Sequence, residues 1–409
     1  MTKLGALLCS ALLLLLATAC SEAKPGRSHD ATPGTGGPTE TASPGSSARA
    51  EPSEDQAVAC SLDTATDARP AAENDDLGPP VVARTSADDG SALVVRGVLS
   101  AGRLLASAST GDSGDQLGTP RLGVLSPSGF AALRYDPSPS RGHQITAAEA
   151  QGSTTTWVET TSMDLFNFDW KIYAADLERP GRRLLADSDT VYGTRPLSPV
   201  YGQTIPTVAG DSVYWAATPP GADRSDGVIW RAGLDDASIE AVSRGVMPSG
   251  AGRSLYFVRR TGDGAQIVRR DTAKGAEWVV STVDSADGEV TRLAASTRLV
   301  AWVVARPQGD AALYIHQRQA GELCRIALHQ RGPETMVMSA AGHFLAWGNG
   351  SVDGDAGEYL LDMRSRGLWR LGEASGYSVG YVGPGAVAWA RLPEDAAQPQ
   401  AAQFLVASW

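Results

Sequence analysis

From Val81 to the C-terminus, apolar residues occur in short runs of β-branched and aromatic side chains rather than at helical spacing. Glycine, proline, aspartate and serine separate these runs. Such a pattern is typical of short strands joined by turns, whereas an amphipathic helix repeats its apolar positions about every 3.6 residues. The pattern therefore predicts an all-β domain over residues 81–409.

One phrase recurs through this region: a small or polar pair, then two or three apolar residues that end in an aromatic ring. Its aromatic residues Trp215, Phe257, Trp302, Trp347 and Trp389 are spaced 42, 45, 45 and 42 residues apart. An interval of about 40–45 residues is the length of one four-stranded blade of a β-propeller. The repeat therefore predicts a β-propeller of four-stranded antiparallel blades, with the aromatic rings packed between blades rather than stacked on a ligand.

Counting these units predicts seven blades, with six or eight as the alternatives. The units span residues 93–135, 145–190, 206–246, 247–285, 291–330, 336–374 and 378–409. The last unit holds only three strands, and the run Pro80-Val81-Val82-Ala83-Arg84 stands alone before the first. This run is predicted to supply the missing outer strand, which would close the ring and remove exposed sheet edges.

The phrase Gly252-Arg253-Ser254-Leu255-Tyr256-Phe257, followed by the strand from Gly264 to Asp271, resembles the repeat of TolB-like and, more broadly, WD40-like propellers. Ile172-Tyr173-Ala174-Ala175-Asp176 carries the same strand ending. The Asp-Gly turn of that family is mostly absent here, so the resemblance is specific to the architecture. It implies a binding or scaffold role at the cell envelope without identifying a partner.

The chain begins with a basic residue, Lys3, and an apolar run from Leu4 to Leu16, followed by Ala17-Thr18-Ala19-Cys20. The run is shorter than the about 20 residues that span a bilayer and matches the apolar core of a secretory signal peptide. Small residues directly before a cysteine resemble the lipobox of bacterial lipoproteins, although Ala17 stands where that family usually has leucine. The resemblance implies cleavage after residue 19 and lipid, such as palmitate, on Cys20. The alternative is ordinary signal-peptide cleavage that leaves Cys20 as a spare thiol.

Residues 20–80 are rich in serine, threonine, proline, glycine, alanine and acidic residues, with few aromatic or β-branched apolar ones. Such a segment buries too little apolar surface to offset the entropy of folding, so it is predicted to be a disordered spacer. The predicted organisation is a signal peptide over residues 1–19, a spacer over residues 20–80 and a propeller over residues 81–409.

The formal net charge of −11 argues against nucleic acid as a partner, because neutralising phosphates requires lysine and arginine. The chain is expected to be a monomer that meets the membrane through its lipid anchor. Of the four cysteines, Cys9 lies in the signal peptide and Cys20 is the lipid site, which leaves Cys60 and Cys324. In an oxidising compartment they form a disulfide or stay as two free thiols.

No pattern for catalysis, cofactor binding or metal binding stands out. The sequence lacks a Gly-x-Ser-x-Gly elbow and a glycine-rich phosphate loop with lysine. The histidines His143, His316, His329 and His343 fall in different parts of the repeat without metal-ligand spacing, so they are predicted to be surface or turn residues. Neither a cofactor nor a metal is expected.

The interval from Trp157 to Trp215 is 58 residues, longer than the other repeats. The excess lies in residues 160–170, between two strands of one blade, and in residues 187–206, between that blade and the next. Connections of both kinds leave the same face of a propeller, so the insertions are predicted to meet on one rim and to bind a ligand there. The candidate binding residues are Phe166, Phe168, Trp170, Tyr192, Arg195 and Tyr201. The alternative is that Phe166, Phe168, Trp170 and Ile172 alternate along one face of a lengthened strand and serve packing.

Together these features predict an extracytoplasmic lipoprotein, anchored to the cell membrane, whose propeller is a non-enzymatic binding or scaffold module for a protein, peptide or glycan. The alternative is an extracytoplasmic lyase or hydrolase with its site at the channel mouth, because propellers host both kinds of function. The scarcity of histidine and the lack of a nucleophile motif favour the binding module.

Overall fold

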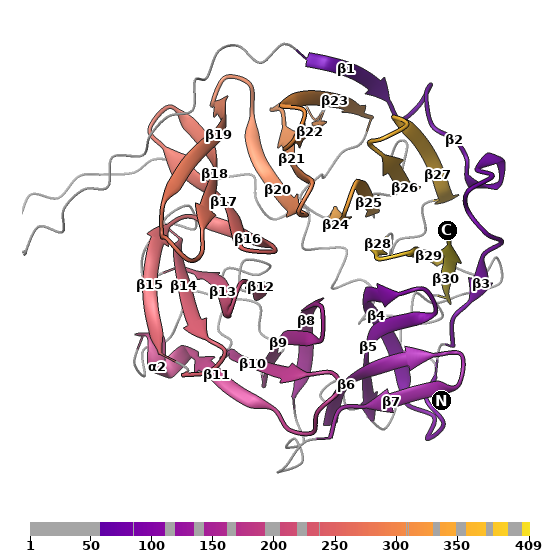
Figure 1. The fold of residues 1–409 in the computed structure, drawn as a ribbon, viewed down its shortest axis with the longest axis vertical. Coiled ribbons are helices and arrows are strands. Elements are labelled where there is room, and N and C mark those ends of the chain that lie inside the picture. The colour runs from indigo at the N-terminus through magenta and orange to yellow at the C-terminus, as the bar shows by residue number, and fades with distance from the viewer. Residues whose placement is uncertain are drawn as a thin grey trace, which may run out of the picture.

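Seven sheets are arranged as blades around a central axis in the computed structural model (Figure 1). The structure describes residues 58–84, 86–110, 119–134, 143–161, 169–192, 205–218, 227–236, 238–307, 309, 311–329, 336–348, 357–373, 379–391 and 403–409. The predicted all-β class and the seven blades are confirmed. In these residues the helical elements are short: α2 (Ser188–Tyr192) and the 3-10 turn η2 (Ala71–Glu73).

Blades 1 to 4 follow the chain from the innermost to the outermost strand. Blade 1 contains β4 (Ala92–Ser100), β5 (Arg103–Thr110), β6 (Thr119–Ser126) and β7 (Gly129–Ala132). Blade 2 contains β8 (Gln144–Gln151), β9 (Thr154–Thr160), β10 (Lys171–Asp176) and β11 (Arg183–Asp187). Blade 3 contains β12 (Thr207–Ala209), β13 (Ser212–Ala217), β14 (Val228–Gly233) and β15 (Ile239–Arg244). Blade 4 contains β16 (Val246–Ala251), β17 (Ser254–Thr261), β18 (Gly264–Asp271) and β19 (Glu277–Asp284).

Blades 5 to 7 repeat this order but take additional strands from the N-terminal side. Blade 5 contains β20 (Glu289–Ala295), β21 (Leu299–Ala305), β22 (Ala311–Gln317) and β23 (Glu322–Leu328). Blade 6 contains β24 (Val337–Ala341), β25 (Phe344–Gly348), β26 (Gly357–Asp362) and β27 (Gly367–Glu373). Blade 7 contains β28 (Gly380–Gly383), β29 (Ala386–Arg391), β30 (Gln403–Ser408) and, from the N-terminal side, β3 (Val81–Val82).

The ring closes as the sequence predicts. Strand β3 is the outer strand of blade 7 and pairs antiparallel with β30, with Val81 opposite Val406 and Val82 opposite Leu405. The Ala83 amide extends this ladder by donating to the Phe404 carbonyl at 2.7 Å. Pairing of the two ends of the domain removes the open edges that an incomplete last blade would leave.

The predicted end of the spacer at Pro80 is wrong, because residues 58–80 lie along the outside of the ring. We call residues 58–82 the strap. Its first strand, β1 (Val58–Asp63), pairs parallel with β23 as a fifth strand of blade 5, and β2 (Arg69–Pro70) pairs parallel with β27 of blade 6. Composition misled the prediction because edge pairing uses backbone groups, which a polar segment carries as well as an apolar one.

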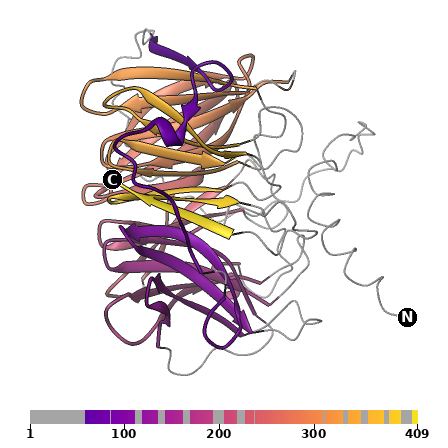
Figure 2. The same ribbon diagram turned by 90° about the vertical axis from the view of Figure 1, so that its right-hand side faces the viewer.

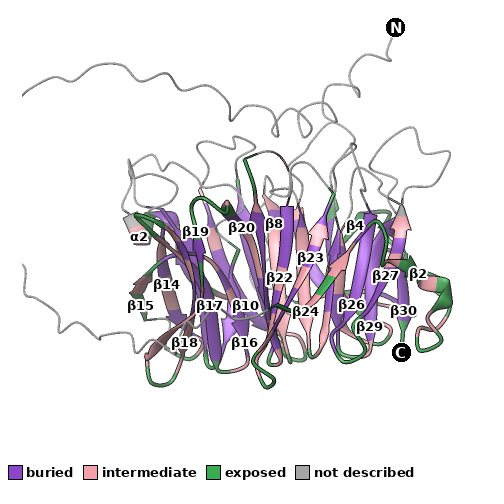
Figure 3. Cartoon of the chain, turned by 90° about the horizontal axis from the view of Figure 1, so that it is seen from above, coloured by how far each residue is buried: buried purple, intermediate pink, exposed green. Residues whose placement is uncertain are grey.

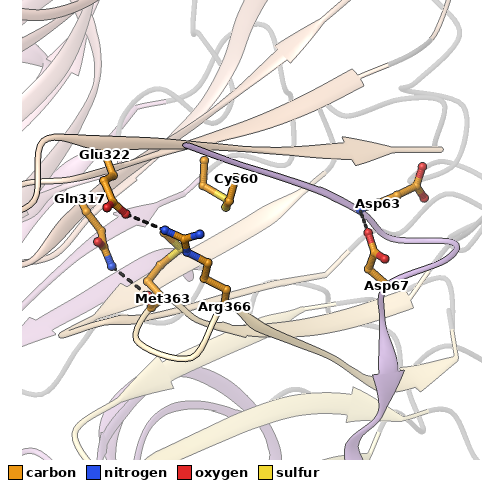
Figure 4. The surroundings of a disulfide bond; sticks show 8 residues. Cys60, Asp63, Asp67, Gln317, Glu322, Met363 and Arg366 are labelled. Carbon is orange, nitrogen blue, oxygen red and sulfur yellow. Dashed lines mark hydrogen bonds and ion pairs between the residues drawn. A yellow bond between two sulfur atoms is a disulfide. The ribbon is translucent and has the colours of Figure 1, made fainter. Parts of the chain in front are cut away.

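A disulfide joins the strap to blade 5. Cys60 of β1 and Cys324 of β23 are paired across the two strands, with their Cα atoms 4.6 Å apart (Figure 4). Near this bond, Arg366 of blade 6 forms an ion pair with Glu322 of blade 5 at 3.0 Å. At the end of β1, Asp63 lies 2.8 Å from His329 Nε2. Of the two alternatives for the cysteines, the structure therefore contains the disulfide.

Aromatic side chains fill the space between blades. Trp157, Trp215, Trp302 and Trp347 are all at most 1 % exposed, and each lies on the second strand of its blade. In three blades this tryptophan stacks on a tyrosine of the third strand; the pairs are Trp157 with Tyr173, Trp302 with Tyr314 and Trp347 with Tyr359. The predicted packing role of the recurring aromatic residues is confirmed.

The two faces of the ring are built differently. The turns from first to second and from third to fourth strands lie on the face that also holds the C-terminus, which we call the turn face (Figures 2 and 3). The second strands end, and the third strands begin, at the opposite face, which we call the loop face. Connections from one blade to the next also begin and end at the loop face.

Polar side chains on the innermost strands bind the next blade's backbone and form a belt around the axis. The links are Arg96 to the Ile145 carbonyl, the Gly250 amide to Thr207 Oγ1, the Ala295 amide to Ser249 Oγ, Arg292 to the Met336 carbonyl and Ser339 Oγ to the Val382 carbonyl. Between blades 2 and 3 the belt contains a carboxylate, Glu149, which accepts from Thr207 Oγ1 at 2.7 Å. Burial raises the pKa of Glu149 to about 7, although the hydrogen bonds from Thr207 and the Val208 amide oppose the shift.

Candidate functional site

Of the predicted binding residues, Trp170 and Tyr192 fall within the described part of blade 2. Phe166, Phe168, Arg195 and Tyr201 lie outside the described residues, as does the lipidation candidate Cys20. Tyr192 is the last residue of α2, which follows β11.

Trp170 lies directly before β10, and its side chain is 3 % exposed. Its ring meets the Trp215 ring edge-on, with centroids 6.3 Å apart. Trp170 therefore packs between blades 2 and 3, as the packing alternative predicts for this residue.

The strand ends that border the two insertions are neighbours in blade 2. Lys171, at the start of β10, is paired with Glu159 near the end of β9 and with Asp187 at the end of β11. The connection after β9 and the connection after β11 therefore leave the loop face side by side. The repeat predicts this arrangement, because second-to-third-strand and blade-to-blade connections share a face.

A buried carboxylate, Glu159, lies at this edge with its side chain only 1 % exposed. It accepts a hydrogen bond from Trp157 Nε1 at 2.8 Å and another from Arg182 Nη1 at 2.9 Å. The His143 Nδ1 atom, which comes from the residue just before β8, lies 3.7 Å from the other Glu159 oxygen. Pairing with a guanidinium and an indole offsets the cost of burying this charge.

Tyr173 completes the cluster beneath Glu159. Its ring stacks on Trp157 with centroids 5.5 Å apart, and the Arg182 guanidinium lies 4.4 Å above its centroid. Burial raises the pKa of Tyr173, and the negative charge of Glu159 adds to the shift. Tyr173 therefore stays a neutral phenol that supports the Glu159–Arg182 pair.

Two further carboxylates order the backbone where the insertions begin and end. Asp187 Oδ1 accepts from the Thr190 amide and hydroxyl, both at 2.6 Å, and so caps α2. Asp169 Oδ1 accepts from the Thr161 amide at 2.9 Å and from the Thr161 hydroxyl at 2.6 Å. The Asp169–Thr161 contact joins the two ends of the first insertion, which fixes where that insertion leaves the blade.

The blade 2 edge thus combines a rigid support, formed by Glu159, Arg182 and Tyr173, with one imidazole suited to proton transfer. Among the described residues the His143 Nδ1 atom has no hydrogen-bond partner, and its side chain is 12 % exposed. A carboxylate close to one imidazole nitrogen orients the ring. The sequence analysis placed His143 at a surface or turn. Its neighbour Glu159, two residues after a repeat tryptophan and so on the same strand face, was the available signal for this cluster.

Among the described residues, no three histidine, cysteine, aspartate or glutamate side chains gather closely enough to hold a metal ion. In the same part of the chain, no helix is long and apolar enough to cross a membrane.

No protein-family model matches the chain, and no curated protein matches it. Among solved structures, an oligogalacturonate lyase in complex with manganese is similar at a TM-score of 0.51 and 10 % identity, covering 81 % of this chain and 97 % of its own. The TolB protein of Acinetobacter baumannii aligns at a TM-score of 0.36 and 11 % identity, over 69 % of this chain and 86 % of its own. A prolyl endopeptidase gives a TM-score of 0.46 at 12 % identity over 65 % of this chain, which spans only 41 % of that enzyme.

At these identities the likeness extends to the fold alone. The chain is a seven-bladed β-propeller, and its structural neighbours include both TolB proteins and propeller-containing enzymes.

Proposed function

We propose that this chain is a lipid-anchored envelope protein whose propeller is an extracytoplasmic binding or scaffold module for a protein, peptide or glycan. The observation that carries this proposal is the loop-face edge of blade 2. There the strand ends that border both insertions lie side by side above the Glu159–Arg182 pair. Long connections on a rigid scaffold are where binding usually resides.

The disulfide supports a location outside the cytoplasm, because disulfides persist in oxidising compartments and are rare where thiols are kept reduced. The strap supports the tethering scheme. Strand β1, with which the described part of the chain begins, lies at the outer edge of blade 5, away from the axis (Figure 1). A tether attached there leaves both faces of the ring open to a partner.

The binding role is tested with the variant Phe168→Ala/Tyr192→Ala of the mature, tethered protein, cross-linked in intact envelopes. We expect the wild-type protein to give a discrete cross-linked species that the variant loses, with the melting temperature unchanged within about 2 °C. The matched control Gln319→Ala, an exposed residue on the turn face, should retain the species. Loss of stability in the double variant would instead assign these rings to packing.

Anchoring is tested separately with Cys20→Ala. We expect the variant to be released as a folded, soluble propeller, because a diacylated cysteine is the attachment point in this scheme. Retention of the variant in the membrane fraction would contradict the lipid anchor and leave the binding role intact.

A second candidate is an extracytoplasmic lyase or hydrolase, and the His143–Glu159 pair favours it. In this scheme His143 acts as the base, Glu159 orients it, and Arg182 holds Glu159 in place through their ion pair. Oligogalacturonate is the first substrate to assay, because a similar structure is a lyase of that name. Cleavage by the wild-type chain, lost in His143→Gln with the fold intact, would establish the enzyme; no cleavage would favour the binding module.

A further inference from the structure

The turn face carries a row of basic side chains. The two-residue turn from the first to the second strand ends in Arg253 in blade 4 and in His343 in blade 6. The corresponding turn of blade 5 places Arg298 before β21, and Arg318 of the same blade donates to the Thr297 carbonyl of that turn at 3.1 Å. We call Arg253, Arg298, Arg318 and His343 the basic arc.

The turns that carry the arc contact one another directly. The Gly210 amide of blade 3 donates to the Gly252 carbonyl of blade 4 at 2.7 Å, and Ser296 Oγ of blade 5 donates to the Gly342 carbonyl of blade 6 at 2.7 Å. A Cβ atom on Gly252 would lie 3.3 Å from Thr297 Cγ2. The basic arc therefore follows one continuous inner rim around the axis.

Tight glycine turns hold this rim close to the sheets. Gly252 has a φ of 62°, a left-handed conformation that favours glycine at the first position of such a hairpin turn. The next residue, Arg253, is therefore presented to solvent from a rigid position, and Arg253 is exposed.

The cations of the arc are not matched by carboxylates. Elsewhere in blade 4, Arg260 pairs with Glu289 at 2.5 Å and Arg270 pairs with Glu277 at 2.9 Å. Arg253 and Arg298, by contrast, form no ion pair among the described residues, and the His343 Nδ1 atom has no hydrogen-bond partner there. In a chain with a net charge of −11, unmatched cations in a row are a local reversal of sign.

A shallow depression of about 460 Å³ adjoins the arc at its blade 4 end. It is lined by Gln151, Gly210, Asp211, Gly252, Arg253, Thr272 and Ala273. This volume falls within the about 300–1,000 Å³ of small-molecule sites. The Gln151 amide and the Thr272 hydroxyl supply neutral donors and acceptors of the kind that bind sugar hydroxyls.

We propose that the turn face binds an anionic glycan along the basic arc. Carboxylate or phosphate groups of the glycan meet Arg253, Arg298, Arg318 and His343, and a sugar ring occupies the depression beside Arg253. This site lies on the opposite face from the blade 2 edge, so it is independent of the function proposed above.

The arrangement of charges favours a narrow chain over a membrane surface. The outer turns of the same face carry the exposed carboxylates Asp235 and Asp236, and Asp271 lies at the outer turn of blade 4. A flat anionic bilayer would approach these carboxylates together with the arginines, and repulsion would cancel the attraction. A chain that follows the inner rim from blade 4 to blade 6 meets Arg253, Arg298 and Arg318, and Asp211 of blade 3 lies beside the depression at the blade 4 end.

The test measures binding of carboxymethyl-dextran, dextran phosphate and plain dextran to the mature chain by calorimetry. We expect the charged dextrans to bind, with affinity falling as sodium chloride rises from about 50 to 500 mM, and plain dextran not to bind. The two charged polymers separate carboxylate from phosphate as the recognised group.

The variant Arg253→Glu/Arg298→Glu should weaken binding of the charged dextrans by at least about tenfold. The control Arg244→Glu makes the same kind of substitution, with half the charge change, at an exposed residue of the outer strand β15 and should change affinity less than about twofold. If the double variant is unstable, the single variants Arg253→Gln and Arg298→Gln replace it.

The proposal is overturned if neither charged dextran binds, if plain dextran binds equally, or if the double variant binds like wild type. It is also overturned if phosphatidylglycerol vesicles or poly-glutamate bind more tightly than both charged dextrans. Because β9, β10 and α2 border both insertions at the opposite face, the Phe168→Ala/Tyr192→Ala variant should bind the dextrans normally whether or not the proposed function holds.

Discussion

Blades 5 and 6 differ from blades 1 to 4 at their outer edges. The strap covers the former with β1 and β2, whereas the outer strands of blades 1 to 4 have no neighbour among the described residues. Burial differs sharply between the outer strands of blades 5 and 3. In β23, Leu323, Cys324, Ile326 and Leu328 are buried, whereas no residue of β15 is buried.

This difference shows how a uniform repeat produces unequal edges. An exposed outer strand needs polar or charged residues to prevent pairing with other chains, and β19 accordingly begins with Glu277 and ends with Asp284. A covered strand is interior, so β27 buries Leu368 and Trp369 beneath the strap. The sequence thus suits this pairing on both sides, in the strap itself and in the apolar outer strands that it covers.

Removing the disulfide, which lies on the side of the ring that the strap covers, should give the largest change in the free energy of unfolding. Cys60→Ser/Cys324→Ser frees a loop closed over a sequence separation of 264 residues, so we expect a loss of about 3–5 kcal/mol in the free energy of unfolding. Urea titration of the oxidised proteins measures this loss. Reducing the wild type should reproduce it, reducing the variant should add nothing, and equal midpoints for both proteins would show that the strap is held by other contacts.

On the open side, the belt carboxylate Glu149 should make stability depend on pH. Its raised pKa means that the folded state binds the proton more tightly than the unfolded state. Its contribution is therefore complete below the unfolded pKa and is lost as pH rises through about 7. We expect the wild type to lose about 2–3 kcal/mol between pH 4.5 and 7.5 relative to Glu149→Gln, measured by denaturant titration. Parallel pH profiles would mean that Glu149 is solvated.

The β3–β30 pairing, which joins the strap-covered blades to the uncovered ones, should contribute less to the free energy of unfolding than the disulfide does. Ala83→Pro removes the amide that donates to the Phe404 carbonyl, so we expect a loss of about 1–2 kcal/mol. Val81→Thr is a matched control in the same strand because the Val81 residue is 63 % exposed, and it should change stability by less than about 0.5 kcal/mol. Equal melting temperatures for the two variants would contradict a closing role for this ladder.

The ion pair at the end of β1 should give the smallest effect. His329 lowers the pKa of Asp63 through a hydrogen bond, so the stabilisation exists above the unfolded pKa of Asp63 and is lost as pH falls through its folded pKa. Both side chains are partly exposed, which screens the pair. Asp63→Asn should cost less than about 1 kcal/mol at neutral pH, and nothing once the pH is low enough to protonate Asp63 in the folded state. A cost that persists at low pH would assign Asp63 a role in the turn to Asp67 instead.

The sequence predicts the ring because its signals are periodic. The spacing of the repeat tryptophans, the incomplete last unit and the isolated run at Val81 determine the blade order and the closing strand. The strap lacks such a signal, since β1 and β2 are short, occur once and bind through backbone groups. The even cysteine count pointed to Cys60 and Cys324, but not to a strand on either side of the bond.

The candidate site was predictable in place but not in composition. The excess length between Trp157 and Trp215 locates the blade 2 edge. The Glu159–Arg182 pair joins the second strand to the turn before the fourth, and a one-dimensional pattern does not show that an arginine side chain reaches across two strands. Trp170 shows the converse error, because an aromatic residue inside an insertion can still belong to the core.

The disulfide also sets the path that mechanical load takes through the molecule. A pull applied through the residues before Val58 reaches Cys60 and crosses to Cys324 on β23, the strand next to β1 in blade 5. Residues 61–82 are then outside the loaded path, so β2 and the closing strand β3 are not peeled from their blades. A tethered ring under tension would therefore be held by a covalent bond to blade 5, while the β3–β30 pairing that closes the ring carries no force.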